Sequence, residues 1–247
     1  MSKAKRVLDP PSNCRRCPRL VAYRKDCTAA EPGWFNRPVP SFGSRRSAKL
    51  LIVGLAPGLR GANRTGRSFT GDQSGELLYS TLLSAGFAQG QYRAVASDSL
   101  ALVDTLVTNA VRCVPPGNKP TAGELKNCRD FLLAVIQELK QLRIIVALGR
   151  VAHDSTLSAF GLRQAAYKFG HGARHELGGG IVLFDSYHCS RYNTNTGRLT
   201  PEMFLSVFER VRAELDCVGS KKAADISDNL PDKIAKHEQH KGPQEGR

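Results

Sequence analysis

Two pairs of cysteines, far apart in the chain, have the type and spacing of metal ligands. Cys14 and Cys17 form a C-x2-C pair on a polar, arginine-rich loop, where burial is a poor explanation for a thiol. Cys113 and Cys128 follow far downstream, and each taken alone is better explained as an ordinary buried thiol. Together the two pairs could enclose one zinc ion or an iron–sulfur cluster, since both accept four thiolates. Cys27 is a further candidate by proximity.

A second candidate for chemistry is the segment 54–75, GLAPGLRGANRTGRSFTGDQSG. Its glycines, arginines and small polar side chains cannot fill a core, which indicates a binding loop. Backbone N–H groups of such a loop can hold a phosphate at a helix start. The segment lacks the GKS or GKT of a P-loop and the G-x-G-x-x-G of dinucleotide sites, so a purely structural connection stays open as an alternative.

The elements that must position these residues follow an α/β pattern. Short runs rich in β-branched residues predict strands at 50–53, 102–108, 144–148 and 181–184. Amphipathic periodicity predicts helices at 74–85, 121–142, 151–160 and 202–215. This alternation predicts a single three-layer α/β/α domain around a central, mainly parallel four-stranded sheet. Ligands of such sheets bind beyond the carboxyl ends of the strands.

We expect this domain to span residues 1–217. Within it, residues 1–45 read as a loop-like amino-terminal arm that needs a staple to become ordered. Residues 218–247 carry few large apolar side chains and predict a disordered tail.

The net charge is +14, and little of it comes from the tail. A basic folded body is the expected footprint of a protein that binds a phosphate backbone, although a high pI also aids solubility. The start of the chain has no apolar h-region, and no apolar stretch reaches the roughly 20 residues that span a bilayer. We therefore expect a cytoplasmic, nucleoid-associated monomer without membrane contact, in a reducing compartment that disfavours disulfides.

Three segments together resemble a known family. GLAPGLRGANRTGRSFTGD at 54–72, TNAVRCVPPGNKPT at 108–121 and SYHCSRYNTNTGRLT at 186–200 are similar, in order and spacing, to the signature stretches of the uracil-DNA glycosylase superfamily. They are most similar to family 5, the type B enzymes, and the CRRC arm agrees with the iron–sulfur cluster of families 4 and 5. The resemblance covers about residues 14–215.

This resemblance implies a set of site residues. A structural 4Fe-4S cluster would be held by the cysteines at 14, 17, 113 and 128, which leaves those at 27, 189 and 217 spare. The base pocket would be formed by Gly54, Leu55, Ala56, Phe69 and Asn109. The catalytic residues would be Asp72, His188 and Asn109.

The implied roles fit the chemistry of base removal. A base must be flipped out of the duplex, at a cost of about a few kcal/mol. Phe69 would stack on it and Asn109 would hydrogen-bond its edge. His188 would stabilise the departing base, and Asp72 would orient the water and offset charge on the sugar. Taken singly, Asp72 is also explained as a helix cap, Asn109 as a turn residue at a strand end and His188 as a core histidine.

Further residues would contact DNA. We expect Arg60, Arg64, Arg67 and Arg198 to contact phosphates, with a solvated charged surface as the alternative for each. The loop that follows His188 would enter the minor groove, with Arg191 and Tyr192 as wedge candidates.

Two positions depart from the family pattern. Leu55 stands where several sister families place a carboxylate or an amide, which is why Asp72 is assigned to the water. Cys189 stands where the family usually has proline, so we expect a looser loop and a thiol near DNA.

We therefore predict a monofunctional glycosylase that removes uracil, and also hypoxanthine or xanthine, from double-stranded DNA that carries a deaminated base. No lysine lies in these motifs to form a Schiff base, so no lyase step is expected. Two alternatives are a damaged-DNA-binding module with the same fold and cluster but no hydrolysis, and a nucleotide-dependent enzyme.

Overall fold

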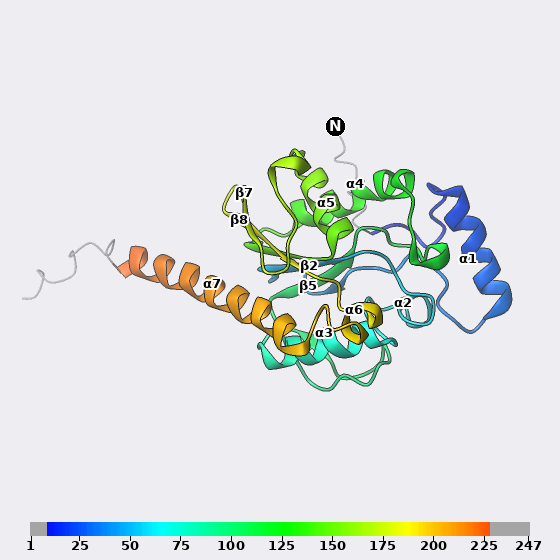
Figure 1. The fold of residues 1–247 in the computed structure, drawn as a ribbon, viewed down its shortest axis with the longest axis horizontal. Helices are drawn as coiled ribbons and strands as arrows, with labels where there is room; N and C mark the ends of the chain where they lie inside the picture. The colour runs from blue at the N-terminus through cyan, green and yellow to red at the C-terminus, as the bar shows by residue number, and fades with distance from the viewer. Residues whose placement is uncertain (1–8, 228–247) are drawn as a thin grey trace, which may run out of the picture.

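A central six-stranded sheet organises the computed structural model, which describes residues 9–227, with side chains to residue 217 (Figure 1). The strand order is β1-β5-β2-β6-β8-β7. The four inner strands are parallel: β5 (Thr105–Asn109), β2 (Leu50–Gly54), β6 (Ile144–Leu148) and β8 (Ile181–Ser186). They correspond to the four predicted strands, and the prediction of a mainly parallel α/β sheet is confirmed.

The prediction of only four strands is wrong, because an antiparallel strand flanks each edge. These are β1 (Phe42–Gly43), paired with β5, and β7 (Arg174–Gly178), paired with β8. The first has two residues and the second is polar and mostly exposed, so neither forms an apolar run. The predicted strand 102–108 also divides at Asp104, which has a positive φ of 46°. Its first part is β4 (Ala101–Leu102), which pairs with β3 (Ala88–Gln89) in a separate two-stranded sheet.

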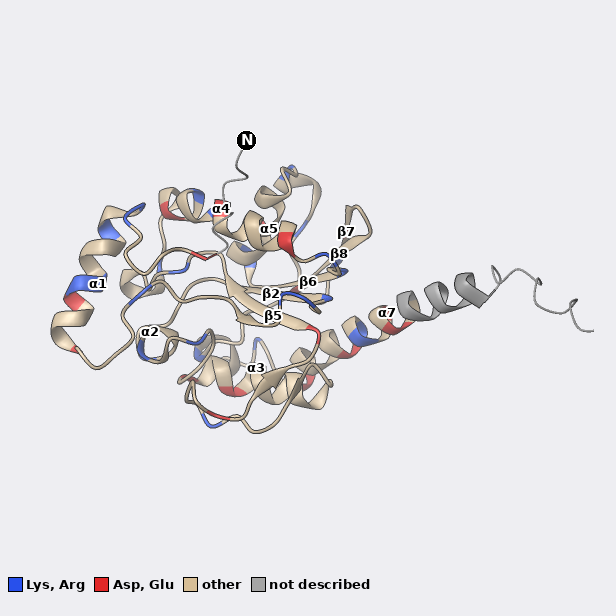
Figure 2. Ribbon diagram, turned by 180° about the vertical axis from the view of Figure 1, so that it is seen from behind, with Lys and Arg blue, Asp and Glu red and all other residues tan. Residues whose placement is uncertain are grey.

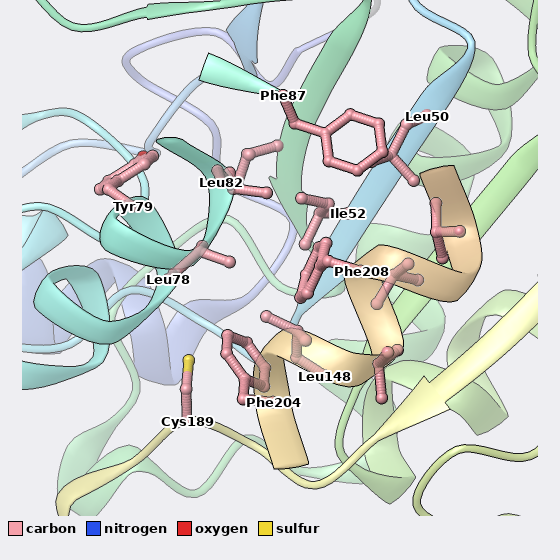
Figure 3. Close-up of a cluster of buried hydrophobic side chains, with 14 of the residues drawn as sticks. Leu50, Ile52, Leu78, Tyr79, Leu82, Phe87, Leu148, Cys189, Phe204 and Phe208 are labelled. Carbon is pink, nitrogen blue, oxygen red and sulfur yellow. The ribbon is translucent and has the colours of Figure 1, made fainter. Parts of the chain in front are cut away.

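Alternate residues of the inner strands face two helical layers. Leu50 and Ile52 face α3 (Gln73–Ser84) and α7 (Pro201–Ser227). Leu51 and Val53 face α4 (Ala122–Glu138) and α5 (Arg150–Ala159). Figure 1 shows the two pairs of helices on opposite faces of the sheet, and Figure 3 shows the α3 and α7 side of the core. The three-layer arrangement follows from this alternation, because both faces of a parallel sheet must be covered.

Local signals place the helix starts. Thr121 and Glu124 form the predicted capping box of α4, and Asp72 caps α3. Shorter helical segments are α2 (Ala62–Thr65), α6 (Arg191–Asn195) and the 3-10 turns at Pro116–Asn118 and Gln164–Ala166. Of the described residues, no helix is long and apolar enough to cross a bilayer.

The amino-terminal arm is more regular than predicted, since it contains α1 (Pro18–Ala30), with proline at its first position. Ion pairs also hold the arm to the body: Arg112 pairs with Asp9 at 2.8 Å, and Arg19 pairs with Glu124 at 2.7 Å. At the other end, α7 runs to Ser227, past its predicted end at 215 and into the segment predicted to be disordered. Residues 228–247 lie outside the described residues.

Candidate active site and cysteine centre

A cavity of about 500 Å³ lies at the carboxyl ends of the four parallel strands. Its walls come from the loops after β2, β5, β6 and β8. The chain passes from β2 to β5 on one side and then to β6 on the other, and open α/β sheets bind ligands where their strand order reverses in this way. The predicted residues that line this cavity are Leu55, Ala56, Phe69, Asp72, Asn109, His188, Tyr192 and Arg198.

Asn109 is the last residue of β5, and its side chain is buried at the cavity wall. Its Nδ2 donates a hydrogen bond to the Ser68 hydroxyl at 3.4 Å. Gly54 is its register partner on β2 and does not itself line the cavity. A Cβ at Gly54 would collide with Oδ1 of Asn109 and lie 2.5 Å from the Phe69 ring. Glycine at this position therefore allows the amide and the ring to meet at the wall.

Phe69 and His188 form one side of the cavity. Their rings stack with centroids 6.0 Å apart and an interplanar angle of 29°. Phe69 is buried and has a positive φ of 53°, a region that bulky residues rarely adopt. Backbone strain of this kind persists only where the surroundings impose it, and it is concentrated at functional sites.

His188 follows β8 by two residues and is half-buried in the cavity wall. Its Nδ1 is a buried nitrogen without a hydrogen-bond partner in the described structure. Burial lowers the pKa of His188 to about 4, so the imidazole is neutral at pH 7. Asn193 donates to the backbone carbonyl of His188 at 2.8 Å and fixes the loop. A neutral imidazole placed in this way can donate one hydrogen bond to an oxygen that gains negative charge.

Asp72 caps α3 and also lines the cavity. One carboxylate oxygen, Oδ1, accepts a hydrogen bond from the Gly75 amide at 3.1 Å, which confirms the helix-cap interpretation. The other oxygen, Oδ2, faces the loop backbone, where a Cβ at Gly58 would lie 2.8 Å from it. The same carboxylate lines the cavity. The helix cap thus holds one oxygen in place while the group borders the site.

Arg67 is buried and paired with a carboxylate, so its predicted phosphate contact is wrong. Its side chain is 6% exposed and donates two hydrogen bonds of 2.7 Å to the buried Asp98 carboxylate. The guanidinium also lies 5.0 Å from the centre of the Phe42 ring. This pairing lowers the pKa of Asp98 to about 2. Arg67 therefore stabilises the glycine-rich loop through a buried ion pair.

The other predicted basic residues of this loop are exposed. Arg64 donates to the carbonyls of Arg60 and Gly71, at 2.9 and 3.2 Å. Figure 2 shows Lys and Arg positions beside α2, and positions of both charge signs on α1 and α7.

The loop after His188 is ordered by α6. Arg191 is exposed and donates to the Gln73 side chain at 2.8 Å, and Tyr192 is 72% exposed at the cavity edge. The Arg198 guanidinium lies 4.5 Å from the centre of the Tyr187 ring. Three of the predicted DNA-contacting residues thus lie together at or near the mouth of the cavity.

The Cys189 thiol does not lie near the molecular surface, so the prediction of a thiol near DNA is wrong. The side chain is buried in the core beside Phe204, as Figure 3 shows. Its sulfur donates to the Ser74 carbonyl at 3.4 Å, and burial raises the pKa of the thiol. Cys189 therefore connects the loop that carries His188 to the first turn of α3.

Several residues of the cavity wall were missed from the sequence. Some lie inside the quoted segments and could have been found there: Pro57, Gly58, Ala62, Ser74, Asn118, Tyr187, Ser190 and Asn193. The others lie outside those segments, and the fold brings them to the wall: Leu148, Gly149, Arg150, Val151 and Phe169.

The four predicted metal-binding cysteines come together at a second site. They line one small, largely apolar cavity between α1, α4 and the loop after β5, together with Leu20 and Phe131. The sulfur atoms of the cysteines at 14, 17, 113 and 128 are the potential metal ligands of this cavity. Cys27 is buried elsewhere on α1 and does not line this cavity.

Two of the four thiols of this centre, those of Cys113 and Cys128, are buried. Burial raises the pKa of Cys113 to about 12 and that of Cys128 to about 11, so without a metal both stay protonated at pH 7. Arg24 donates to the Cys14 carbonyl at 2.6 Å, and the Asn127 side chain donates to the Cys17 sulfur at 3.7 Å. Four soft donors in a closed apolar site fit a metal centre.

Fold and cavity together define a class: a three-layer α/β protein with an amide, an imidazole and a carboxylate around one pocket at its strand ends. The chain belongs to the uracil-DNA glycosylase superfamily, whose family model matches residues 40–212. A type-5 uracil-DNA glycosylase of Thermus thermophilus is 49% identical over 200 residues, which cover 78% of this chain and 90% of that relative. A type-5 enzyme of Pyrobaculum aerophilum is 38% identical over 210 residues, covering 83% and 91%. A type-4 uracil-DNA glycosylase of the same organism is 33% identical over 152 residues, covering 61% and 63%.

Proposed function

We propose that this protein is a monofunctional uracil-DNA glycosylase that removes uracil from DNA by hydrolysis and leaves an abasic site. The observation that carries the proposal is the meeting of Asp72, Asn109 and His188 around one cavity at the strand ends. The names of the type-5 relatives support the same activity.

The cavity is suited to hold a base that has left the duplex. Asn109 offers an amide that both donates and accepts, and Phe69 offers an aromatic wall. These contacts recover part of the cost of extrusion, which is about a few kcal/mol and smallest for a mispaired base. A volume of about 500 Å³ also leaves room for a purine, so we include hypoxanthine and xanthine in the proposal.

Bond cleavage separates charge between the base and the sugar. When the N-glycosidic bond breaks, its electron pair goes to the base, and the N–H of neutral His188 stabilises the oxygen that gains charge. The Asp72 carboxylate offsets positive charge on the sugar and accepts a proton from the attacking water. No lysine of the described residues lines the cavity, which supports a glycosylase without a lyase step.

The cavity mouth supplies the DNA contacts of this proposal. Arg60, Arg64, Arg191 and Arg198 are exposed and meet phosphates, and Tyr192 is the wedge beside the extruded base. The partner is double-stranded DNA, and the location in the cell is the cytoplasm at the nucleoid.

We also infer that the cysteine centre holds a 4Fe-4S cluster. A tetrahedral zinc ion with Zn–S bonds of about 2.3 Å brings its four sulfurs within about 4 Å of one another. Among the described residues, no three of these cysteines have sulfurs that all lie within 4.8 Å of one another, so the wider cluster fits better. The cluster would cross-link the segment before α1 to α4 and to the loop after β5, and its role would be structural rather than catalytic.

Base release tests the function directly. Purified, cluster-loaded protein is incubated with a duplex that carries one uracil opposite guanine, and abasic sites are measured by alkaline cleavage. Wild type is expected to release the base, and Asp72→Asn is expected to be slower by about 10²–10⁴-fold. Asparagine also caps helices, so this variant keeps the start of α3 intact.

Absence of abasic sites with cluster-loaded wild type overturns the proposal. Salt-sensitive binding to the same duplex without base release would instead support a damage-binding module.

A further inference from the structure

Two buried side chains and one half-buried side chain outside the cavity come together from three different elements. His153 lies on α5, His175 on the edge strand β7 and Asp185 on β8. Nδ1 of His153 is 2.8 Å from one Asp185 carboxylate oxygen, and Nε2 of His175 is 3.1 Å from the other. Two imidazole nitrogens and one carboxylate oxygen lie within 4.8 Å of one another. Zinc accepts this donor set.

The far nitrogen of His153 has the partner that metal-binding histidines usually have. Nε2 lies 3.0 Å from the backbone carbonyl of Tyr167 and must donate to it. Ligating histidines almost always donate their second N–H to a carbonyl or carboxylate, which fixes the tautomer. With Nε2 protonated, Nδ1 could give its lone pair to a metal ion bound beside Asp185, in place of the proton that it shares with the carboxylate in the metal-free protein.

The Asp185 carboxylate brings a buried charge to this cluster. Asp185 and His153 are fully buried, and His175 is 15% exposed. In the described structure, the ion pairs of Asp185 are made with these two histidines and with no lysine or arginine. Without a metal, both nitrogens of His153 face acceptors, so a proton must be held between His153 and Asp185. A divalent ion could replace that proton and neutralise the carboxylate.

We propose that His153, His175 and Asp185 form a structural site for a divalent transition-metal ion, most simply zinc. The ion would join the edge strand β7 to β8 and α5. Asp185 lies three residues before His188, so the site also supports the strand end that enters the cavity. This proposal does not depend on the glycosylase activity or on the cysteine centre.

Zinc titration of the full-length, cluster-loaded protein tests the site. After dialysis against a chelator, isothermal titration with zinc chloride is expected to show one binding event in wild type. His175→Ala is expected to weaken it at least 100-fold. His171→Asn is the matched control, because His171 lies on the same segment but accepts a hydrogen bond from the Tyr187 amide instead. It is expected to leave the affinity within threefold.

Cobalt distinguishes this site from the cysteines. Cobalt(II) in the proposed site is expected to show d–d bands without thiolate charge-transfer absorption, and these bands are expected to be absent in Asp185→Asn. If a variant fails to fold, the wild-type spectrum still tests the proposal, because wild type without these d–d bands contradicts it. Absence of zinc uptake by wild type, or uptake that persists in folded His175→Ala, overturns the proposal.

Discussion

The cavity and the cysteine centre show how one fold builds two opposite kinds of site. The first cavity is open, and one residue that lines it, His188, has a buried nitrogen, Nδ1, with no hydrogen-bond partner among the described residues. The cysteine centre is closed, and apolar side chains such as Leu20 and Phe131 surround its thiols. Polar groups left without partners cost stability and are retained where a ligand will meet them, whereas a closed centre contributes stability.

The largest expected effect lies at the closed site. Cys113→Ser is expected to abolish cluster absorbance and to lower the free energy of unfolding by more than about 5 kcal/mol, because metal binding and folding are coupled. Denaturant unfolding followed by circular dichroism measures this. Cys217→Ser is the control, since Cys217 is exposed and should have no effect. Equal stability of the two variants would show that ion pairs alone hold the arm.

The next largest effect is expected at the buried ion pair between Arg67 and Asp98. Arg67→Ala leaves the Asp98 carboxylate buried and unpaired, which is expected to cost about 3–5 kcal/mol of unfolding free energy. Arg60→Ala is the matched exposed arginine. It is expected to leave stability unchanged and to reduce the salt slope of DNA binding by about 1. If Arg67→Ala instead reduced the salt slope and left stability unchanged, Arg67 would be a phosphate contact after all.

Gly54, which lies beside Asn109 and Phe69, distinguishes access of the base to the cavity from stability of the fold. Gly54→Ala places a methyl group against Asn109 and Phe69, and we expect single-turnover base release to fall about 100-fold, with about 1–3 kcal/mol lost from overpacking. Gly33→Ala is the control, because no atom lies within 4 Å of its added Cβ. Full activity of Gly54→Ala would mean that the base does not reach this wall.

The smallest effect is a pH dependence at the open site. The pKa of His188 is lowered to about 4 in the folded protein, so the unfolded chain binds more protons between pH 4 and 6.5. Stability is therefore complete above about pH 6.5 and is lost as the pH falls toward 4, by about 1–2 kcal/mol for this half-buried group. Unfolding free energies of wild type and His188→Asn over this range measure the difference. Parallel curves would contradict the buried, neutral histidine.

The local sequence determined the frame and much of the site. The alternation of Leu50, Leu51, Ile52 and Val53 fits a strand buried on both faces, and the capping box at Thr121 placed the start of α4. Strand ends and short motifs likewise brought Asn109, His188 and Asp72 to one edge of the sheet. These features are readable because each depends on neighbours in the chain or on the pairing rules of parallel strands.

Only the tertiary structure decided which side chains have partners. Arg67 and Arg60 belong to the same glycine-rich loop, yet one meets a buried carboxylate from a distant segment and the other meets solvent. The Cys189 thiol turned into the core, and His153, His175 and Asp185 converged from three elements without any sequence motif. The physical reason is that burial and charge pairing depend on contacts between residues far apart in the chain, which no local pattern encodes.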